Sequence, residues 1–194
     1  MTPKPRPLAF LIAGPNGSGK TTASATLLPE GVTFVNADLI AQEESGERST
    51  MADISAGRKL IQLVEGLVKR GEDFAMETTL SSRLLLDRVR GWQRDGYQVH
   101  VLFFYLPSPE LAVERVRGRV AEGGHDVPEE TIRRRYRSGL KLFLQHYLDL
   151  ADAWRFYDNS TQGPPRLIAR KNVEGERRIP EEATWNRLTM EAAR

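Results

Sequence analysis

The segment that most restricts the fold of this chain is a glycine-rich motif directly after a short apolar run. Residues 8–13 are continuously apolar, and Gly14-Pro-Asn-Gly-Ser-Gly-Lys-Thr21 comes next. The motif matches G-x-x-x-x-G-K-[ST], in which glycines let the backbone curl so that its N–H groups face a phosphate. The apolar run predicts a strand covered on both faces, and residues 20–28 predict the helix that follows. Strand, loop and helix in this order predict a phosphate-binding P-loop.

The rest of the chain alternates short apolar runs with amphipathic stretches. We expect further strands at 33–36, 74–77, 97–106, 154–157 and 166–171, and helices at 52–69, 82–94, 110–121, 128–148 and 181–193. Strands that alternate with helices imply right-handed crossovers and a parallel three-layer sheet. The chain is therefore expected to form an α/β fold as a single domain over residues 1–194. Within it we expect a flexible N-terminus at 1–7, a helix–lid–helix unit at 109–148 and a C-terminal appendage at 163–194.

Composition excludes several classes of protein. The chain has no cysteine and three histidines, so disulfide scaffolds, thiolate zinc sites and cysteine nucleophiles are excluded. Its 28 Lys and Arg nearly balance its 26 Asp and Glu, which argues against a nucleic-acid partner. The apolar runs are of strand length, which argues against a membrane span, and the N-terminus lacks an apolar core of signal-peptide length. We therefore expect a cytoplasmic location.

The P-loop assigns roles to individual residues. Lys20 is expected to reach the β- and γ-phosphates of ATP or GTP, and the Thr21 hydroxyl to bind Mg²⁺. No strand ends in the Asp-Glu pair of a motor ATPase, and no Asn-Lys-x-Asp guanine-reading motif occurs. These features favour a three-layer P-loop NTPase of the nucleotide-kinase kind, with an arginine-rich helical lid, that acts on a small molecule. The other expected P-loop contacts to the nucleotide come from Gly14, Asn16, Gly17, Ser18, Gly19 and Thr22.

Two carboxylates follow strands at the edge where ligands bind in parallel sheets. Asp38 comes just after the second expected strand, where it either accepts the proton of an attacking hydroxyl or holds a Mg²⁺ water; the alternative is a helix N-cap. Glu77 ends the third expected strand, ahead of Thr78. It either orients the acceptor or joins the metal shell, and the alternative is an exposed strand end.

The segment from 115 to 137 gathers positive charge, with seven arginines and four acidic residues around the pair Gly123-Gly124. Glycines provide a hinge, and arginines that fold over a nucleotide neutralise the charge on a transferred phosphoryl group. Arg119 lies nearest the hinge. An apolar stripe on the second helix is expected to be core, with Arg134 pointing nearly opposite it and Arg133 and Arg135 beside it. The alternative is that these are ordinary exposed helices rich in arginine.

Asn159 follows the fifth expected strand, at the point where loops of P-loop kinases pass near the adenine. The segment Asp158-Asn-Ser160 also fits a plain Asx turn. The residues leave both interpretations open.

Together these segments resemble the short, stand-alone zeta-toxin-like P-loop kinases. The resemblance covers residues 8–168, and its more specific part is the Gly-Gly-His lid with the arginine triplet after it. The segments that carry it are Gly14-Pro-Asn-Gly-Ser-Gly-Lys-Thr-Thr22, Asn36-Ala-Asp38, Glu77-Thr-Thr-Leu-Ser81, Gly123-Gly-His-Asp-Val-Pro128, Ile132-Arg-Arg-Arg-Tyr136 and Tyr157-Asp-Asn-Ser160.

The resemblance implies a phosphotransferase that uses ATP or GTP with Mg²⁺. Zeta toxins phosphorylate the 3′-hydroxyl of a UDP-N-acetyl amino sugar and are held in check by a small helical antitoxin. In that pattern Lys20 holds the phosphates, Asp38 is the base, Arg119 and Arg134 clamp the γ-phosphate, and Glu77 belongs to the acceptor site. This chain is shorter than the well-known toxins, whose insertions help to form the sugar-nucleotide pocket.

Two other functions are compatible with the same residues. One is a nucleotide-dependent binding or regulatory module that acts on a partner protein without a phosphorylated acceptor. The other is an antibiotic- or nucleoside-modifying phosphotransferase on the same fold, which differs only in its acceptor.

Overall fold

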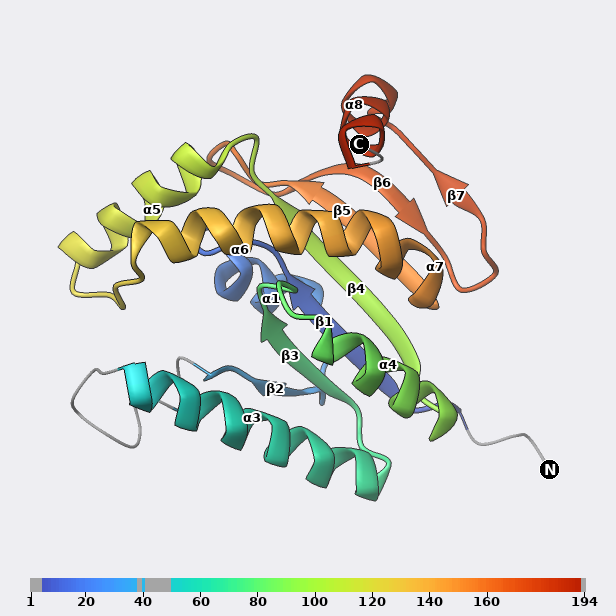
Figure 1. The fold of residues 1–194 in the computed structure, drawn as a ribbon. Helices are drawn as coiled ribbons and strands as arrows, with labels where there is room; N and C mark the ends of the chain where they lie inside the picture. The colour runs from blue at the N-terminus through green and yellow to red at the C-terminus, as the bar shows by residue number, and fades with distance from the viewer. Residues whose placement is uncertain (1–4, 38–39, 41–49, 193–194) are drawn as a thin grey trace.

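The computed structural model describes residues 5–37, 40 and 50–192, in which a mostly parallel sheet is flanked by helices (Figure 1). The seven strands lie in the order β2-β3-β1-β4-β5-β6-β7. The strands are β1 (Leu8–Ala13), β2 (Thr33–Val35), β3 (Phe74–Thr78), β4 (Gln98–Tyr105), β5 (Ala153–Asp158), β6 (Arg166–Lys171) and β7 (Arg177–Arg178). The helices are α1 (Lys20–Leu27), α3 (Thr50–Arg70), α4 (Leu84–Arg94), α5 (Pro109–Ala121), α6 (Glu129–Leu142), α7 (Leu148–Leu150) and α8 (Glu182–Ala192), with a π-helical turn, η1 (Phe143–Tyr147), between α6 and α7.

Strand β1 lies at the centre of the parallel part, between β3 and β4. Ala13 at its end is level with Thr78 of β3 and with Phe103 of β4. The loop after β1 and the last residues of β3 therefore emerge together at the carboxyl edge of the sheet. This register confirms the expected α/β fold and brings the P-loop beside Glu77.

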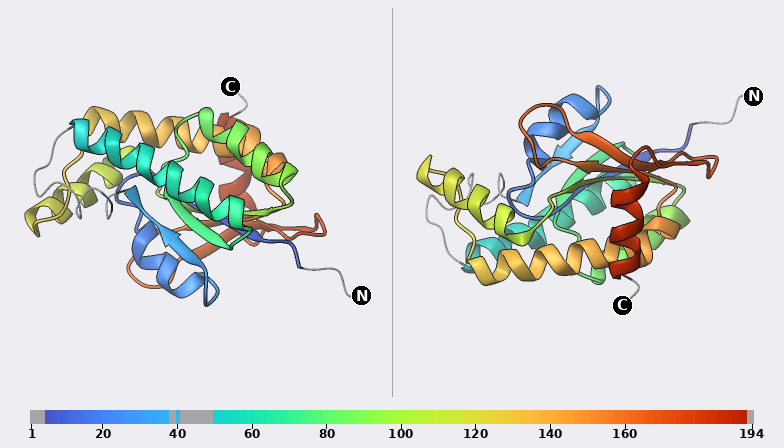
Figure 2. Two further views of the ribbon diagram at one scale, coloured as in Figure 1. Left: turned by 90° about the horizontal axis from the view of Figure 1, so that it is seen from below. Right: turned by 90° about the horizontal axis from the view of Figure 1, so that it is seen from above.

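The two faces of the sheet are covered unequally (Figure 2). Helices α3, α4, α6 and α8 lie on one face, whereas α1 lies on the other. The apolar residues divide in the same way, into a large buried cluster that includes Leu11, Phe103 and Trp154 and a small one that includes Phe10, Ile12 and Leu102.

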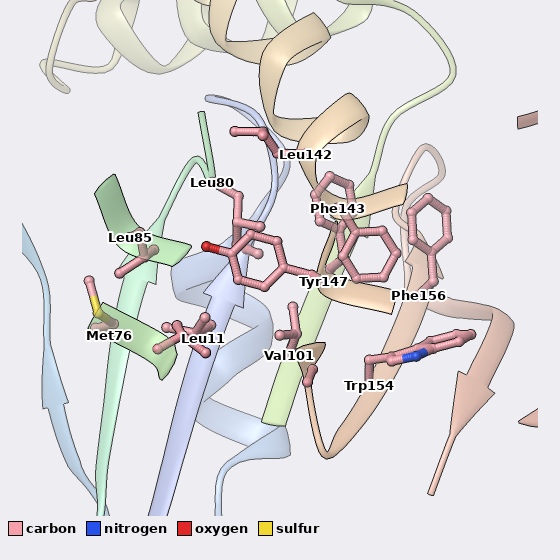
Figure 3. Packing of buried hydrophobic residues seen from close by; sticks show 14 of the residues in the cluster. Leu11, Met76, Leu80, Leu85, Val101, Leu142, Phe143, Tyr147, Trp154 and Phe156 are labelled. Carbon is pink, nitrogen blue, oxygen red and sulfur yellow. The ribbon is translucent and has the colours of Figure 1, made fainter. Parts of the chain in front are cut away.

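The large cluster joins strands to helices through aromatic rings. In Figure 3, Leu11, Val101 and Phe156 rise from the strands toward Phe143 and Tyr147 of η1. The Phe103 and Phe156 rings stack with their centroids 5.1 Å apart, and Phe143 closes over both. The π-helical turn η1 thereby ties the carboxyl end of α6 to the middle of the sheet.

The C-terminal segment departs from the expected parallel arrangement, because β6 and β7 run antiparallel to their neighbours. A parallel connection needs a crossover of a dozen or more residues, and the segment between β5 and β6 is too short for one. The terminal helix α8 returns to the sheet, where Trp185 stacks on Trp154 at 5.3 Å. The short strand β7 was not expected from the sequence.

Residues 6 and 7, just before β1, form hydrogen bonds with the segment that leads into β4. At the N-terminus, Arg6 donates to the carbonyl of Gly96 and Pro7 accepts from Gln98 N, each at 2.9 Å. The helix expected at 128–148 is continuous but changes to π-helical hydrogen bonding over five residues.

Within the part of the chain that the structure describes, no helix is long and apolar enough to cross a membrane.

Helix α6 makes a backbone contact with the loop after β3 at Gly139. This glycine is buried, and a Cβ there would lie against the carbonyl oxygen of Thr79. Gly118 of α5 has a contrasting environment: it is exposed, and a Cβ there would meet only open space.

The Gly139→Ala variant is expected to lose about 1–3 kcal/mol of unfolding free energy, because the methyl group forces α6 away from the loop. The matched Gly118→Ala variant should be unchanged or gain about 0.4–1 kcal/mol, since it only restricts the unfolded chain. Urea unfolding of both variants measures the difference. Equal stabilities for the two variants would contradict the contact.

Candidate active site

The P-loop, residues 14–20, joins the end of β1 to the start of α1. Gly17 and Gly19 have φ angles of 77° and 73°, a left-handed conformation that favours glycine. A Cβ on Gly17 would lie 2.8 Å from the carbonyl oxygen of Ala112, and a Cβ on Gly19 would lie 2.6 Å from Nδ2 of Asn159. The loop is thus packed between α5 and the segment after β5, so both positions require glycine.

The start of α1 is left open to a ligand. Gly19 occupies the N-cap position, and no side chain caps the helix. The first N–H groups of a helix have no partner within it and carry its partial positive charge. An uncapped helix start beside a glycine-rich loop is a site for phosphate.

Lys20 is almost fully buried, with 5% of its surface exposed. Its Nζ donates to the carbonyl of Pro15 at 2.9 Å and lies 3.4 Å from Oε1 of Glu77. These contacts keep the ammonium group inside the curl of the loop. An incoming phosphate would meet a cation that is already positioned.

Glu77 connects the P-loop to two strand ends. Its Oε2 accepts from the Thr21 hydroxyl at 2.7 Å and from Nδ2 of Asn36 at 2.8 Å. Asn36 follows β2, so one carboxylate near the end of β3 links residues that follow β1 and β2. Its burial is compensated by three polar partners.

The donor set around Thr21 suits Mg²⁺. Magnesium takes oxygen ligands, is held by few protein groups, and keeps waters or substrate phosphates in its other positions. A threonine hydroxyl and a carboxylate in mutual contact, next to a phosphate loop, meet this requirement. Over the described residues, no cluster of three or more His, Asp and Glu forms a self-sufficient metal cage.

A cavity of about 180 Å³ opens beside these groups. It extends from the P-loop to the lid, so a phosphate on Lys20 and a second molecule in the cavity would be neighbours. The Asn16 side-chain oxygen at its wall is buried and has no hydrogen-bond partner among the described residues, which leaves it for a ligand. The lining residues are Asn16, Lys20, Asn36, Ala37, Ala56, Glu77, Thr78, Thr79, His125, Val127 and Arg135.

The loop after β3 forms one wall of this cavity and is conformationally strained. Leu80 has a φ of +55°, which is unusual for a residue other than glycine, and its side chain is fully buried. Its N–H donates to the Thr78 hydroxyl at 3.0 Å. The buried leucine and the Gly139 contact hold the loop, and Thr78 is thereby positioned at the cavity.

The lid arginines divide by what they contact. Arg117 pairs with Glu129 at 2.7 Å, and Arg133 pairs with Glu129 and Glu110. Arg119 donates to the carbonyl of His125 at 2.7 Å and so braces the hinge loop. Arg135 is the arginine of the triplet that lines the cavity, whereas Arg134 is exposed.

Arg115 and Asn159 form a bridge behind the P-loop. The Arg115 guanidinium donates to the carbonyls of Asn159 and Ser160, each at 2.7 Å. Asn159 in turn donates from Nδ2 to the carbonyl of Ser18 at 2.7 Å. The Asn159 side chain therefore supports the P-loop backbone, and Ser160 N also closes the Asx turn on Asp158 at 2.9 Å.

The structure brings together most of the residues singled out from the sequence. Lys20, Thr21, Glu77 and Thr78 meet at one edge, and Thr22 is exposed on the first turn of α1. Asp38 lies outside the described residues, so its role as base stays a prediction. The roles of Arg119 and Arg134 on the γ-phosphate also stay predictions. Sequence reasoning did not assign Asn36, Arg115 or Arg135 to the site, although Asn36 lies two residues before Asp38.

The fold and the phosphate loop define a P-loop NTPase with a kinase-like architecture. The chain belongs to the AAA domain family AAA_33, whose model matches residues 10–139. It is 32% identical over 128 residues to an uncharacterized protein of Haemophilus influenzae, a match that covers 66% of this chain and 91% of that protein.

Several solved structures share the fold at low sequence identity. An AvrRxo1-ORF1:ORF2 structure with ATP is 17% identical with a TM-score of 0.74, covering 95% of this chain and 64% of that chain. The PezAT toxin–antitoxin system of Streptococcus pneumoniae is 19% identical with a TM-score of 0.57, covering 80% and 69%. A candidate kinase from Chloroflexus aurantiacus is 18% identical with a TM-score of 0.54, covering 68% and 77%. This chain thus spans less than two thirds of the AvrRxo1-ORF1:ORF2 chain.

The bridge behind the P-loop gives a stability prediction. Arg115→Gln is expected to cost about 1.5–3 kcal/mol of unfolding free energy, because two partly buried carbonyls lose charged donors. Arg117→Gln removes the same charge from the same helix but breaks only a surface ion pair, so its cost should stay below about 1 kcal/mol. Denaturant unfolding without nucleotide measures both variants, and equal losses would show that the bridge has no special role.

Proposed function

We propose that this protein is a Mg²⁺-dependent kinase that transfers the γ-phosphoryl group of ATP, or GTP, to a hydroxyl of a small molecule. The observation that carries the proposal is the contact network of Glu77 with Lys20, Thr21 and Asn36 beside an uncapped helix start. It joins a phosphate site, a magnesium donor set and a cavity for a second molecule.

The phosphate end of the reaction rests on the P-loop. Backbone N–H groups of residues 14–19 and the Lys20 ammonium would hold the β- and γ-phosphates, with further contacts from Asn16, Ser18, Thr21 and Thr22. Thr21 and Glu77 would hold Mg²⁺, which would supply positive charge to the phosphates when bound. We place Asn159 behind this loop as its support and keep its contact to the base as part of the proposal.

The acceptor end rests on the cavity. Asp38 would take the proton from the acceptor hydroxyl as its oxygen bonds to the γ-phosphorus and the bond to the leaving ADP oxygen breaks. Glu77 and Thr78 would orient the acceptor. Charge on the transferred group would be neutralised by Lys20 and by lid arginines, for which we propose Arg135 beside Arg119 and Arg134.

The finer proposal concerns the acceptor and a partner. Resemblance to zeta toxins favours a UDP-N-acetyl amino sugar as acceptor and a separate antitoxin as regulator. The shared fold with the PezAT toxin–antitoxin system and the AvrRxo1-ORF1:ORF2 complex supports this proposal at the level of architecture.

The proposal is tested by incubating the protein with ATP and Mg²⁺ and a panel of UDP-sugars, nucleosides and aminoglycosides, followed by mass analysis. We expect one phosphoryl group to be added to a UDP-amino sugar. Transfer to a nucleoside or aminoglycoside instead would identify the rival phosphotransferase. Tight nucleotide binding with no modified acceptor would favour a regulatory module.

Two variants serve as controls for this assay. Lys20→Ala should abolish turnover, because the phosphates lose their buried cation. Asp38→Asn should bind ATP nearly as the wild type does and yet fail to transfer. Near-wild-type transfer by Asp38→Asn would show that Asp38 is not the base.

The arginine triplet gives a separate prediction. Arg135→Ala should lower kcat about 100-fold or more, because the side chain at the cavity wall stabilises transferred charge. Arg134→Ala removes the same charge from the neighbouring exposed position and should lower kcat less than about tenfold. Steady-state kinetics with the accepted substrate measures both variants, and the reverse order would assign the larger share of the charge stabilisation to Arg134.

A further inference from the structure

The sheet face that carries α1 has a second cavity, far along the strands from the P-loop. Its volume is about 370 Å³, and its walls include Leu8, His100 and Ala153 near the amino ends of β1, β4 and β5. The P-loop follows the carboxyl end of β1, so the two cavities lie at opposite edges of the sheet. Phe10, Leu27 and Leu102 make the floor of the second cavity apolar.

Next to this cavity, three arginines form a row across neighbouring strands. Arg155 of β5 is level with Arg170 of β6, and Arg170 is level with Arg178 of β7. Residues opposite each other in adjacent strands point to the same face. The buried neighbours Trp154, Phe156 and Ala169 face the large cluster on the other side. All three arginines are therefore directed to the face with α1, and all three are exposed.

Like charges placed directly opposite each other destabilise a sheet. Within the described ranges, no carboxylate forms an ion pair or hydrogen bond with Arg155, Arg170 or Arg178, whereas the other arginines of β6 and β7, Arg166 and Arg177, each pair with a carboxylate. Burial lowers the pKa of nearby His100, and Lys171, which also lines the cavity, donates its ammonium group to the Leu148 carbonyl, so the exposed charge of this surface comes from the arginines.

Protection of a sheet edge explains only part of this row. Charged residues on an edge strand prevent pairing with other chains, which accounts for Arg178 on β7. Arg155 and Arg170 belong to strands that are paired on both sides. Their repulsion has no structural compensation in the described chain, and an external anion would supply one.

We propose that this arginine row and its cavity bind an acidic segment of a partner protein, in which carboxylates engage Arg155, Arg170 and Arg178 and an adjacent apolar side chain enters the cavity. Guanidinium groups bind carboxylates in a bidentate manner. Adjacent strands are about 4.8 Å apart, so the row spans about 10 Å, which matches carboxylates spaced along one peptide segment.

The chemistry of the surface excludes other occupants. A second copy related by a twofold axis through the row would bring arginines onto arginines. A site for single-stranded nucleic acid needs exposed aromatic platforms, and the Phe and Trp side chains at this cavity, Phe10 and Trp154, are only 7% and 1% exposed. An apolar floor beside a charged row fits a peptide with mixed apolar and acidic side chains. This site is independent of the proposed kinase function.

The test uses the full chain and a fluorescein-labelled peptide of repeated Glu-Glu-Leu, with binding followed by fluorescence anisotropy. A saturating nonhydrolysable ATP analogue with Mg²⁺ keeps the P-loop occupied. We expect the peptide to bind with strong salt dependence and to raise the melting temperature. The Arg155→Gln/Arg170→Gln variant should bind it about tenfold or more weakly, yet melt at the same or a higher temperature at low salt, because the repulsion is gone.

The matched control is Arg94→Gln/Arg137→Gln, which removes the same charge from exposed positions on α4 and α6, on the opposite face. This control should bind the peptide as the wild type does. The proposal is overturned by an equal loss in both variants, or by no peptide binding to the wild type in the presence of the ATP analogue. Tighter binding of an RNA oligonucleotide of equal charge at the same arginines would also overturn it, in favour of nucleic acid.

Discussion

The Glu77 carboxylate is the interaction on which the arrangement of the site depends. It lies at the end of a buried strand, where an isolated charge is unfavourable, and its contacts to Lys20, Thr21 and Asn36 remove that penalty. The same contacts position the phosphate-binding lysine and the metal-binding hydroxyl before any ligand arrives. Because Glu77 lies near the end of β3 and its partners follow the neighbouring strands β1 and β2, the register of the sheet sets the geometry of the site.

A second set of contacts, which does not involve Glu77, supports the backbone of the P-loop. Arg115 and Asn159 support the P-loop from α5 and from the segment after β5, while Gly17 and Gly19 allow both to approach closely. The P-loop is thus held in two ways. The Glu77 carboxylate holds its Lys20 and Thr21 side chains, and Asn159 holds its backbone through the Ser18 carbonyl. Helix α5 and the segment after β5 share these contacts, so both are coupled to the phosphate site.

Local pattern predicted the P-loop, the parallel strands and the position of Glu77, because apolar runs and strand ends are properties of short segments. The reversal at β6 was within reach of the same reasoning, since the preceding loop is too short for a crossover. The same reasoning could not predict which lid arginine lines the cavity and which is exposed. A helical stripe shows which face of α6 meets the core, but the cavity lies beside that face, so Arg135 at its flank reaches the cavity and Arg134 does not. The support given by Arg115 depends on tertiary contacts between α5 and a loop 44 residues away.

The contact of Gly139 with the Thr79 carbonyl makes this point of α6 a fulcrum. The start of the helix at Glu129 is ten residues away, about 15 Å along its axis, while Arg135 is four residues and about 6 Å away. A tilt of about 10° about the fulcrum would move the tip by about 2.6 Å and Arg135 by about 1 Å. Such a tilt would therefore displace the hinge loop more than twice as far as the arginine at the cavity.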